Sequence, residues 1–426
     1  MSQAQRVFIT GLSALSAAGL DADSHWASVC HGQSKIAPIT QADLSTWTHA
    51  LGGELPPLAP SDLLPDRKLM KAVARQDVLG IHAAMQAVVH SQMIDYQKTL
   101  SDPTDFNEET AVYVGSPGNK YFQQYDFLPL LAKTQGDMKA FGEQLFDEVH
   151  PMWLLRILPN NVLAYTGMTY GFKGVNHNIT NHALGGMQAI LEAYHAIRSG
   201  QAQRAVVVAY DLATEPQALF YYERLGVISA RHLKPFDAEH DGTILGDGAC
   251  ALVLESESSV QARQAACYGE ILGGRTATEA MGLFSIQNTG EALSTLIHDT
   301  LKDVDLDPSA LDVIVAHGNG NPLSDCSEAR AIERVFTTHP VPVTAFKWSM
   351  GHTICTSGML DTVLGSYVVQ TGTIPGIANL NQVAPMCAAL HLDASARTIS
   401  SDTRHAMIIN RGFAGMNACL VIKGCV

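Results

Sequence analysis

The sequence predicts an α/β fold made of two similar halves. Apolar runs of strand length alternate with segments of helical periodicity through most of the chain. The composition, 46% hydrophobic and 16% charged with 35 glycines, suits a well-buried, enzyme-like body. The 426 residues suffice for two domain-sized units or one large duplicated fold. The same strand–turn–helix order appears on both sides of a divide near residues 255–268. Because no low-complexity linker separates them, we expect the halves, 1–258 and 259–426, to share one core.

The first half opens with strand-like RVFITG, a turn rich in small residues and a helix that contains Trp26. Residues 65–89 predict one long amphipathic helix with its basic residues at the start. The stretch ETAVYVGSPG indicates a second strand that ends in turn residues. Residues 119–161 are rich in aromatic residues and methionine and lack an α/β rhythm, so we expect an inserted cap or interface segment there.

A strand-to-helix turn follows at residues 176–186, NHNITNHALGG. The strand-like start meets two glycines, and the next segment, MQAILEAYHAIRSG, has helical spacing. Enzymes often expose a Ser or Cys at such an elbow, at the positive end of the helix. Here the apex reads His182-Ala183-Leu184, which contains no nucleophile.

Beyond the elbow, AQRAVVVAYD and DGACALVLES predict buried strands of the kind found inside sheets. The second half shows a similar alternation of strands and helices. LDVIVAHGNGN indicates a strand and glycine turn, followed by a helix over 324–336 and the strand PVPVTAF. A helix from residue 353 and the paired strands of HAMIINRGFAGMNACLVI complete it.

Charge and cysteine usage exclude several classes of protein. A formal net charge of −14 argues against nucleic acid as a partner, since phosphate backbones need basic patches. No signal-peptide core or membrane-spanning apolar run is present, so a cytoplasmic location is expected. None of the eight cysteines forms a CxxC pair, which disfavours zinc and thioredoxin motifs. A cytosolic chain of this size needs no disulfide, and we expect mostly buried, inert thiols.

Several segments, in order along nearly the whole chain, resemble the β-ketoacyl-acyl-carrier-protein synthase (ketosynthase) family, which has the thiolase fold. The segments that carry the resemblance are VFITGLSALSAAGLD, IRSGQAQRAVVVAYD, KPFDAEHDGTILGDGACALVLE, VIVAHGNGNPLSD, KWSMGHTICTSG and RGFAGMNACLVI. The resemblance implies a thiolase-like α/β fold of two halves, layered α-β-α-β-α. It implies no cofactor and no metal, because substrates arrive on the phosphopantetheine arm of an acyl carrier protein.

The resemblance also assigns site residues. His317 and His352 match the catalytic histidine pair, and Lys347 precedes His352 by five residues as in the family. Asp325 and Glu328 match acidic positions of the same network, and Phe413 matches the phenylalanine that gates the pocket. The position of the nucleophilic cysteine falls on Ala183.

In the family reaction a cysteine takes an acyl group, and two histidines stabilise the oxyanion formed when a malonyl thioester loses CO2. Ala183 cannot accept an acyl group, so covalent catalysis at this elbow is excluded. His317 and His352 have two interpretations: a surviving oxyanion site, or a buried network that is costly to dismantle piecemeal. Lys347 disfavours a metal bound by these histidines.

Other residues of the pocket also depart from the family. His182 replaces a small residue, and its ring is expected to fill space near the missing thiol. Asn319 and Asn321 replace threonines that contact the pantetheine arm. Cys355, which replaces a glycine one turn into the next helix, is more simply a packing residue than a relocated nucleophile.

Two further groups have a functional and an ordinary interpretation. One is a basic group at helical spacing, either a docking patch for an acidic carrier protein or a solvated face. It consists of Arg67, Lys68, Lys71 and Arg75. The other is an aromatic group that either lines or blocks an acyl tunnel or packs in a core. It consists of Tyr121, Phe122, Tyr125, Phe127 and Trp153.

The resemblance and Ala183 together predict a chain-length-factor-like, non-condensing subunit. Such a subunit pairs with a cysteine-bearing ketosynthase and shapes the acyl tunnel in polyketide, aryl polyene or fatty-acid-type biosynthesis. One alternative is a malonyl-carrier decarboxylase that uses the histidine pair. Another is a full condensing enzyme whose cysteine was replaced by engineering, and a scaffold without a pocket is the remaining possibility.

Overall fold

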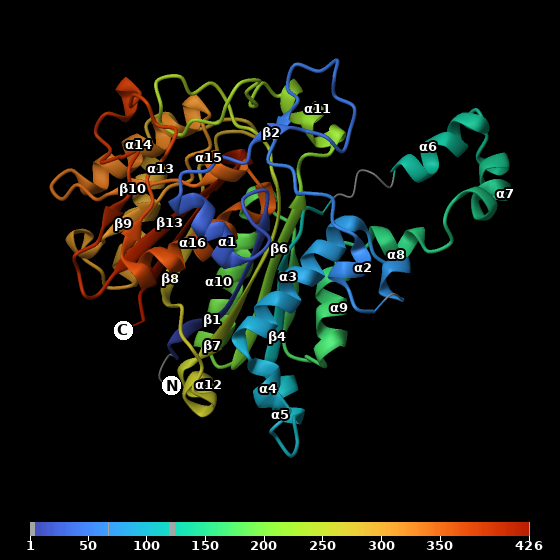
Figure 1. The fold of residues 1–426 in the computed structure, drawn as a ribbon, viewed down its shortest axis with the longest axis horizontal. Helices are drawn as coiled ribbons and strands as arrows, with labels where there is room; N and C mark the ends of the chain where they lie inside the picture. The colour runs from blue at the N-terminus through green and yellow to red at the C-terminus, as the bar shows by residue number, and fades with distance from the viewer. Residues whose placement is uncertain (1–4, 67, 119–123, 426) are drawn as a thin grey trace.

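The computed structural model describes residues 5–66, 68–118 and 124–425. Within these residues, ten strands form one mixed sheet in the order β10-β9-β13-β14-β8-β1-β7-β6-β4-β5 (Figure 1). The strands of the first half are β1 (Val7–Ser16), β4 (Thr110–Gly115), β5 (Asn176–Ile179), β6 (Arg204–Leu212) and β7 (Asp247–Ser256). Those of the second half are β8 (Gly269–Thr278), β9 (Val313–Val315), β10 (Val343–Thr344), β13 (His405–Gly412) and β14 (Met416–Lys423).

The strand order repeats when it is followed inward from either edge. β4 is parallel to β5 and β6, and β7 is antiparallel to β6 and β1. In the same way β9 is parallel to β10 and β13, and β14 is antiparallel to β13 and β8. Among the named strands of the described residues, those of the two five-stranded units pair with each other only where Val7–Ile9 of β1 lies against β8. The two halves predicted from the sequence are therefore two copies of one topology, and we propose that the division falls at α12 (Glu257–Arg263).

Two helices lie between the five-stranded units. α10 (Gly185–Arg198) contacts β4 and β6 of the first unit and β8 and β14 of the second. α16 (Ser357–Thr371) contacts β13 and β14 and also β1 and β7. α16 is apolar on nearly all sides and buried along most of its length, as a helix in a middle layer must be. With α3 (Arg75–Ser91) on the outer face of the first unit and α13 (Glu291–Asp303) on that of the second, the expected α-β-α-β-α layering is confirmed.

The remaining elements are short or lie at the periphery. They are α1 (Ala22–Cys30), α2 (Pro60–Leu63), α4 (Met93–Gln97), α5 (Thr104–Glu108), α11 (Pro216–Arg224), α14 (Pro322–Phe336), α15 (Lys347–Met350), and the paired short strands β2 (Ala37–Pro38) with β3 (Leu51–Gly52) and β11 (Thr373–Ile374) with β12 (Arg397–Thr398). No helix in the described part of the chain is long and apolar enough to cross a bilayer.

The long helix predicted over residues 65–89 begins later than expected. α3 starts at Arg75, where the Asp77 carboxylate accepts a hydrogen bond from the Ala74 backbone N–H at 2.9 Å and caps the helix. The preceding residues form only a 3₁₀ turn over Leu69–Lys71. Lys68 and Lys71 therefore do not share a helix face with Arg75, and the prediction of one continuous helix is wrong.

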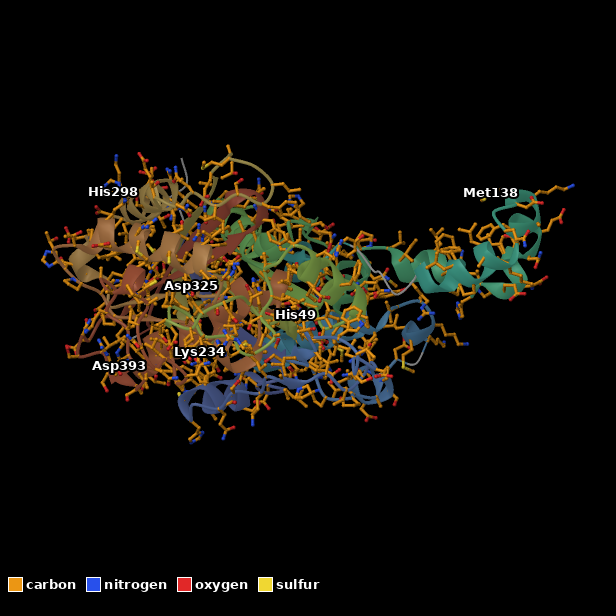
Figure 2. The ribbon with its side chains drawn as sticks, turned by 90° about the horizontal axis from the view of Figure 1, so that it is seen from above. His49, Met138, Lys234, His298, Asp325 and Asp393 are labelled. Carbon is orange, nitrogen blue, oxygen red and sulfur yellow. A yellow bond between two sulfur atoms is a disulfide. The ribbon has the colours of Figure 1, made fainter. Side chains whose placement is uncertain are left out.

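Residues 124–157 form an arm that extends away from the body of the protein. It contains α6 (Gln124–Lys133), α7 (Met138–Glu148) and α8 (Trp153–Ile157), and α9 (Asn161–Tyr170) leads back to the sheet (Figure 1). Met138 lies at the outer end of this arm, far from the other labelled residues (Figure 2). The sequence predicted an inserted cap or interface segment over residues 119–161, and the choice between the two stays a prediction.

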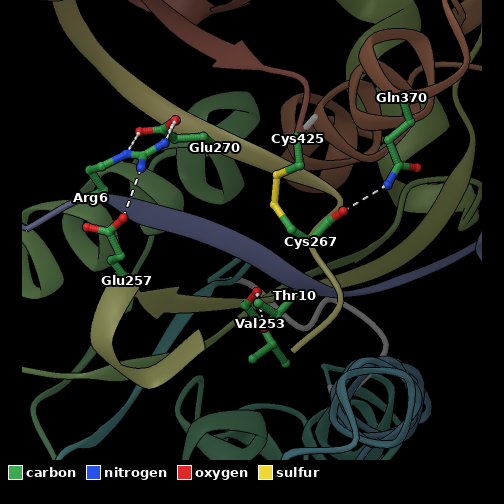
Figure 3. Close-up of a disulfide and its surroundings, with 8 residues drawn as sticks. All are labelled: Arg6, Thr10, Val253, Glu257, Cys267, Glu270, Gln370 and Cys425. Atoms are coloured by element: carbon green, nitrogen blue, oxygen red, sulfur yellow. Dashed lines mark hydrogen bonds and ion pairs between the residues drawn. A yellow bond between two sulfur atoms is a disulfide. The ribbon is translucent and has the colours of Figure 1, made fainter. Parts of the chain in front are cut away.

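A disulfide joins Cys267, just before β8, to Cys425, just after β14 (Figure 3). A chain of this size was expected to need no disulfide, and the other six of its eight cysteines are free thiols. The sheet register explains the pairing, since Lys423 of β14 lies opposite Glu270 of β8 and thereby brings the two cysteines together. Their Cα atoms are 6.0 Å apart although 158 residues separate them in sequence. Because the two cysteines are so far apart in sequence, their contact cannot be predicted until the order of the strands is known.

Candidate functional site

A cavity of about 250 Å³ lies where the two halves meet. It brings together most of the residues predicted from the sequence. Those that line it are His182, Ala183, His317, Asn319, Asn321, His352 and Phe413. Lys347, Asp325 and Glu328 lie behind the wall and do not line the cavity.

Ala183 occupies the apex of a strained turn between β5 and α10. The turn spans His182–Leu184, and His182 has a φ of 47°, in the left-handed region that β-carbon-bearing residues avoid. Gly185 is required next, because a Cβ there would lie 2.7 Å from the Cys355 Sγ atom. The methyl group of Ala183 is 1% exposed and offers no nucleophile, so the elbow geometry persists without its chemistry.

The second half contains a matching turn, Ile354–Thr356, directly before α16. Its first residue, Ile354, also has a positive φ, 40°, and the turn contacts the His182–Leu184 turn. Cys355 thus takes the place in the second half that Ala183 takes in the first. It lies in the turn rather than one turn into the helix. Burial raises the pKa of its thiol well above the ordinary value, and the nearby Asp211 carboxyl raises it further, so Cys355 is an inert packing thiol.

His317 and His352 face each other with ring centroids 5.1 Å apart in an edge-on arrangement. The Nδ1 atom of His317 accepts a hydrogen bond from the Arg411 backbone N–H at 3.3 Å. The Nδ1 atom of His352 accepts one from the Ile354 backbone N–H at 3.1 Å. An accepting Nδ1 carries no proton, so each neutral ring holds its proton on Nε2. Burial, and next the charge of Lys347, lower both pKa values well below the usual range, which keeps both rings neutral donors.

Lys347 forms a buried ion pair with Asp361 of α16, with 2.7 Å between Nζ and the carboxylate oxygen. Their side chains are only 2% and 3% exposed. Burial raises the pKa of Asp361, and the ammonium group of Lys347 opposes that rise. Asp361 was not predicted. An aspartate inside an otherwise apolar helix was the sequence signal for it, since such a group needs a buried partner.

Glu328 and Asp325, both on α14, hold the loop that carries His317. Glu328 accepts hydrogen bonds from the backbone N–H groups of His317, at 2.7 Å, and Gly318, at 3.0 Å. Asp325 accepts from the backbone N–H groups of Phe236 and Gly320 and pairs with His240. Burial raises the pKa of Glu328 to about 7. Both carboxyl groups therefore position the site and do not face its ligand.

Asn319 and Asn321 line the cavity but use their side-chain oxygens locally. Asn321 caps α14 by accepting from the backbone N–H groups of Leu323 and Ser324. Asn319 accepts from the backbone N–H of Asn321 at 3.0 Å. The replacements thus stabilise the loop and helix start, and their amide N–H groups remain for contact with a ligand.

Four stacked or edge-on rings line the cavity together with Ala183. The His182 ring stacks on Phe413 with centroids 4.5 Å apart, and its Nε2 atom lies 2.5 Å from the Tyr222 hydroxyl. Tyr222 also stacks on Phe413 at 5.8 Å, and Phe284 meets Phe413 edge-on. Burial lowers the pKa of His182 to about 4. The prediction that His182 fills space near the missing thiol is consistent with this stack, whereas Tyr222 was not foreseen.

Arg411 is a second unforeseen member of the cavity wall. It is 5% exposed and pairs with Glu279 at 3.0 Å. It also donates to the Ser324 backbone oxygen and the Asn417 side chain. A buried arginine with all its partners fixed ties β13, β14 and α14 together behind the His317 ring.

The described members of the predicted basic group and aromatic group do not line the cavity. Lys68, Lys71 and Arg75 are exposed, and Arg67 lies outside the described residues. Phe127 and Trp153 pack edge-on at 4.6 Å within the arm, while Tyr121, Phe122 and the side chain of Tyr125 lie outside the described residues. No described residue of the 119–161 segment lines the cavity. Among the described residues, no cluster of three or more His, Cys, Asp or Glu side chains could hold a metal ion.

Fold and site define a condensing-enzyme scaffold, and the chain belongs to the β-ketoacyl synthase family. The model of the β-ketoacyl synthase N-terminal domain matches residues 4–259, and that of the C-terminal domain matches residues 268–381. The chain is similar to the 3-oxoacyl-[acyl-carrier-protein] synthase 2 proteins of Synechocystis sp. and Coxiella burnetii, each 26% identical over 98% of both chains.

Solved structures of ketosynthases share the fold. The ishigamide ketosynthase/chain length factor superimposes with a TM-score of 0.87 at 23% identity, over 99% of this chain and 100% of that one. A β-ketoacyl synthase from Burkholderia phymatum gives a TM-score of 0.86 at 24% identity over the same shares. The predicted thiolase-like fold is confirmed.

Proposed function

We propose that this chain is a chain-length-factor-like, non-condensing subunit of a heterodimeric β-ketoacyl-carrier synthase. The observation that carries the proposal is Ala183 at the apex of an intact elbow, in the same cavity as His317 and His352. The scaffold keeps the shape of a condensing site without a group that can form an acyl thioester. Its fold likeness to the ishigamide ketosynthase/chain length factor supports the same assignment. The cytoplasm is the proposed location.

Two surfaces support assembly with a partner subunit. β5 is the edge strand of the sheet, and its first residues, Asn176 and His177, are exposed, so its free backbone groups can pair with another strand. The arm exposes apolar side chains that a soluble monomer would normally cover. These are Leu128, Leu131, Met138, Phe146, Leu154 and Leu155. The cysteine-bearing ketosynthase is the proposed partner for both surfaces.

An acyl carrier protein is the proposed source of the substrate, bound on its phosphopantetheine arm. Lys68, Lys71 and Arg75 are exposed cations in a chain of net charge −14, and they offer a local positive surface for an acidic carrier. The pathway is one of polyketide, aryl polyene or fatty-acid-type synthesis.

The test is reconstitution with purified components. The chain alone, given acyl-carrier and malonyl-carrier, is expected to form no elongated product. Together with a cysteine-bearing ketosynthase from the same organism it is expected to form a one-to-one complex in native mass spectrometry and to elongate. A matched complex whose partner lacks its own cysteine serves as control. Elongation by this chain alone contradicts the proposal.

A second candidate function is decarboxylation of malonyl-carrier. The observation that favours it is the pair of neutral histidines, each with Nε2–H as its only ring donor. Two such donors stabilise the enolate oxygen that forms as CO2 leaves, and the step needs no nucleophile. Release of CO2 from malonyl-carrier by the chain without a partner would support this function.

A further inference from the structure

A second, smaller recess of about 80 Å³ lies next to the main cavity. His182, Tyr222 and Ile354 line both spaces and form the partition between them. We call the smaller space the polar recess. Its other walls combine apolar side chains, Leu212 and Ala218 among them, with polar groups from three elements.

Four of the polar side chains that line this recess, those of Gln76, His182, Asp211 and Glu215, keep hydrogen-bonding capacity that no described residue uses. Gln76 of α3 is only 3% exposed, and its amide nitrogen has no partner within the described residues. The Nδ1 atom of His182 is likewise buried and unpartnered there. The Glu215 carboxyl at the start of α11 makes no hydrogen bond to any described residue. Asp211 at the end of β6 accepts only from backbone N–H groups, those of Cys355, at 3.3 Å, and Leu212. Unpaired buried polar groups are costly, which indicates a ligand that completes them.

The types of unpaired atom decide which chemistry fits. The Gln76 amide supplies N–H donors and needs an acceptor, which an ammonium group or a metal ion does not offer. Burial raises the pKa of Asp211 and of Glu215 to about 7 each, so near neutral pH part of each carboxyl population carries a proton to donate. A carbonyl or hydroxyl oxygen accepts from all of these groups. The apolar side chains of the recess fit the carbon atoms on either side of such an oxygen.

We propose that the polar recess receives an uncharged, oxygen-bearing segment of an acyl chain in preference to a plain aliphatic one. Gln76 and Glu215 hydrogen-bond to the oxygen of the chain, and Asp211 of β6 lies on the same side of the recess. The side chains of His182 and Tyr222 separate the recess from the main cavity, so the acyl chain passes between them. The proposal rests on the proposed function, because it concerns the tunnel that this chain would shape. It adds the class of chain: one bearing keto or hydroxyl groups.

The test compares three ligands on the purified full-length chain by calorimetry. They are non-hydrolysable amide analogues of acyl-pantetheine with six-carbon chains: hexanoyl, 5-oxohexanoyl and 6-aminohexanoyl. We expect the 5-oxohexanoyl analogue to bind about tenfold more tightly than the hexanoyl one, as one added buried hydrogen bond predicts. In Gln76→Leu this ratio should fall toward one. Gln86→Leu, on the same helix but outside the recess, is the matched control and should keep the ratio.

Glu215→Gln retains hydrogen-bonding capacity and should preserve most of the preference. Equal binding of the hexanoyl and 5-oxohexanoyl analogues, or binding of neither at millimolar concentration, overturns the proposal. Tightest binding of the 6-aminohexanoyl analogue also overturns it and identifies an ammonium site instead. The proposed heterodimer fails separately, by the absence of a complex in native mass spectrometry, so the two failures are distinguishable.

Discussion

The imidazole of His182 lies nearly parallel to the ring of Phe413, with an angle of 22° between their planes and 4.5 Å between their centroids. Both rings line the cavity that also contains Ala183, and the hydrogen bond to Tyr222 fixes the imidazole in place. The elbow therefore lacks its nucleophile and also shares its cavity with a fixed aromatic stack. A change at one residue does not explain both features.

Restoring the thiol alone is expected to fail. In Ala183→Cys, the His182–Phe413 stack still occupies the cavity that the new sulfur would face, so an acyl-carrier should not acylate it. The measurement is radiolabelled or mass-spectrometric detection of acyl-enzyme and elongated product, with Ala183→Cys/His182→Ala as the companion that opens the space. Condensation by Ala183→Cys alone would identify the chain as a full condensing enzyme whose cysteine had been replaced.

The stack itself should contribute measurably to stability. A double-mutant cycle of His182→Ala and Phe413→Ala is expected to give a coupling free energy of about 0.5–1.5 kcal/mol, the range for stacked aromatic pairs. Urea unfolding of the four proteins measures it. Trp26, which stacks on Tyr367 instead, provides the control cycle: Trp26→Ala with His182→Ala should be additive. A coupling indistinguishable from zero would show that the two rings do not stack in solution.

The histidine pair yields a prediction about residual chemistry. If the chain decarboxylates malonyl-carrier, His352→Ala should lower the rate about 10²–10³-fold, the usual cost of one lost oxyanion donor. Because burial and Lys347 lower both histidine pKa values well below the ordinary 6.5, the rate should show no histidine inflection between about pH 6 and 8. CO2 release in the variant equal to wild type would assign the decarboxylation to another site.

The sequence predicted the fold and most of the cavity because both depend on local pattern and on motifs. The elbow and the His317 turn each follow a strand, and the repeated topology brings the strand ends of the two halves together. The resemblance to the ketosynthase family is what assigned His182, Ala183 and His352 to one site before any coordinates. The buried strands were recognisable for the same reason, since β6 and β7 each contain a continuous apolar run in their middle.

Features that depend on long-range pairing were not predicted. The partner of Lys347 lies one helix further on, and Tyr222 reaches the site from a peripheral helix whose placement no periodicity reveals. The Cys267–Cys425 link follows from the β8–β14 register alone. The late start of α3 reflects the competition between helix periodicity and capping by Asp77, which periodicity cannot resolve.

The buried ion pair behind the histidines should be sensitive to removal of one partner. Lys347→Met leaves the Asp361 carboxylate buried and alone, which is expected to cost about 3–5 kcal/mol in the free energy of unfolding. The double variant Lys347→Met/Asp361→Leu should recover most of that loss, because apolar groups of similar size replace the pair. Urea unfolding measures both. A double variant as unstable as Lys347→Met would show that the lysine acts through other contacts.

The raised pKa of Glu215 should make the free energy of unfolding depend on pH. Burial raises its pKa from 4.5 to about 7; Asp247 adds to the rise and Arg75 opposes it. Between these two values the folded protein binds more protons at Glu215 than the unfolded chain does. The contribution of this residue to stability is therefore greatest below the unfolded pKa and is lost as pH rises through the folded pKa.

Glu215→Gln cannot ionise and removes this dependence. The variant is expected to gain stability relative to wild type at about pH 8 and to show no such gain at about pH 4.5. Burial also raises the pKa of Asp211 to about 7, so Asp211→Asn should likewise gain stability at about pH 8. Its gain should be smaller, because the variant loses the charged acceptor of the Cys355 backbone N–H. Urea unfolding at both pH values checks the sign. If Glu215→Gln is less stable than wild type at pH 8, the folded protein stabilises the Glu215 carboxylate. Water or hydrogen-bond donors in the recess would then solvate that carboxylate.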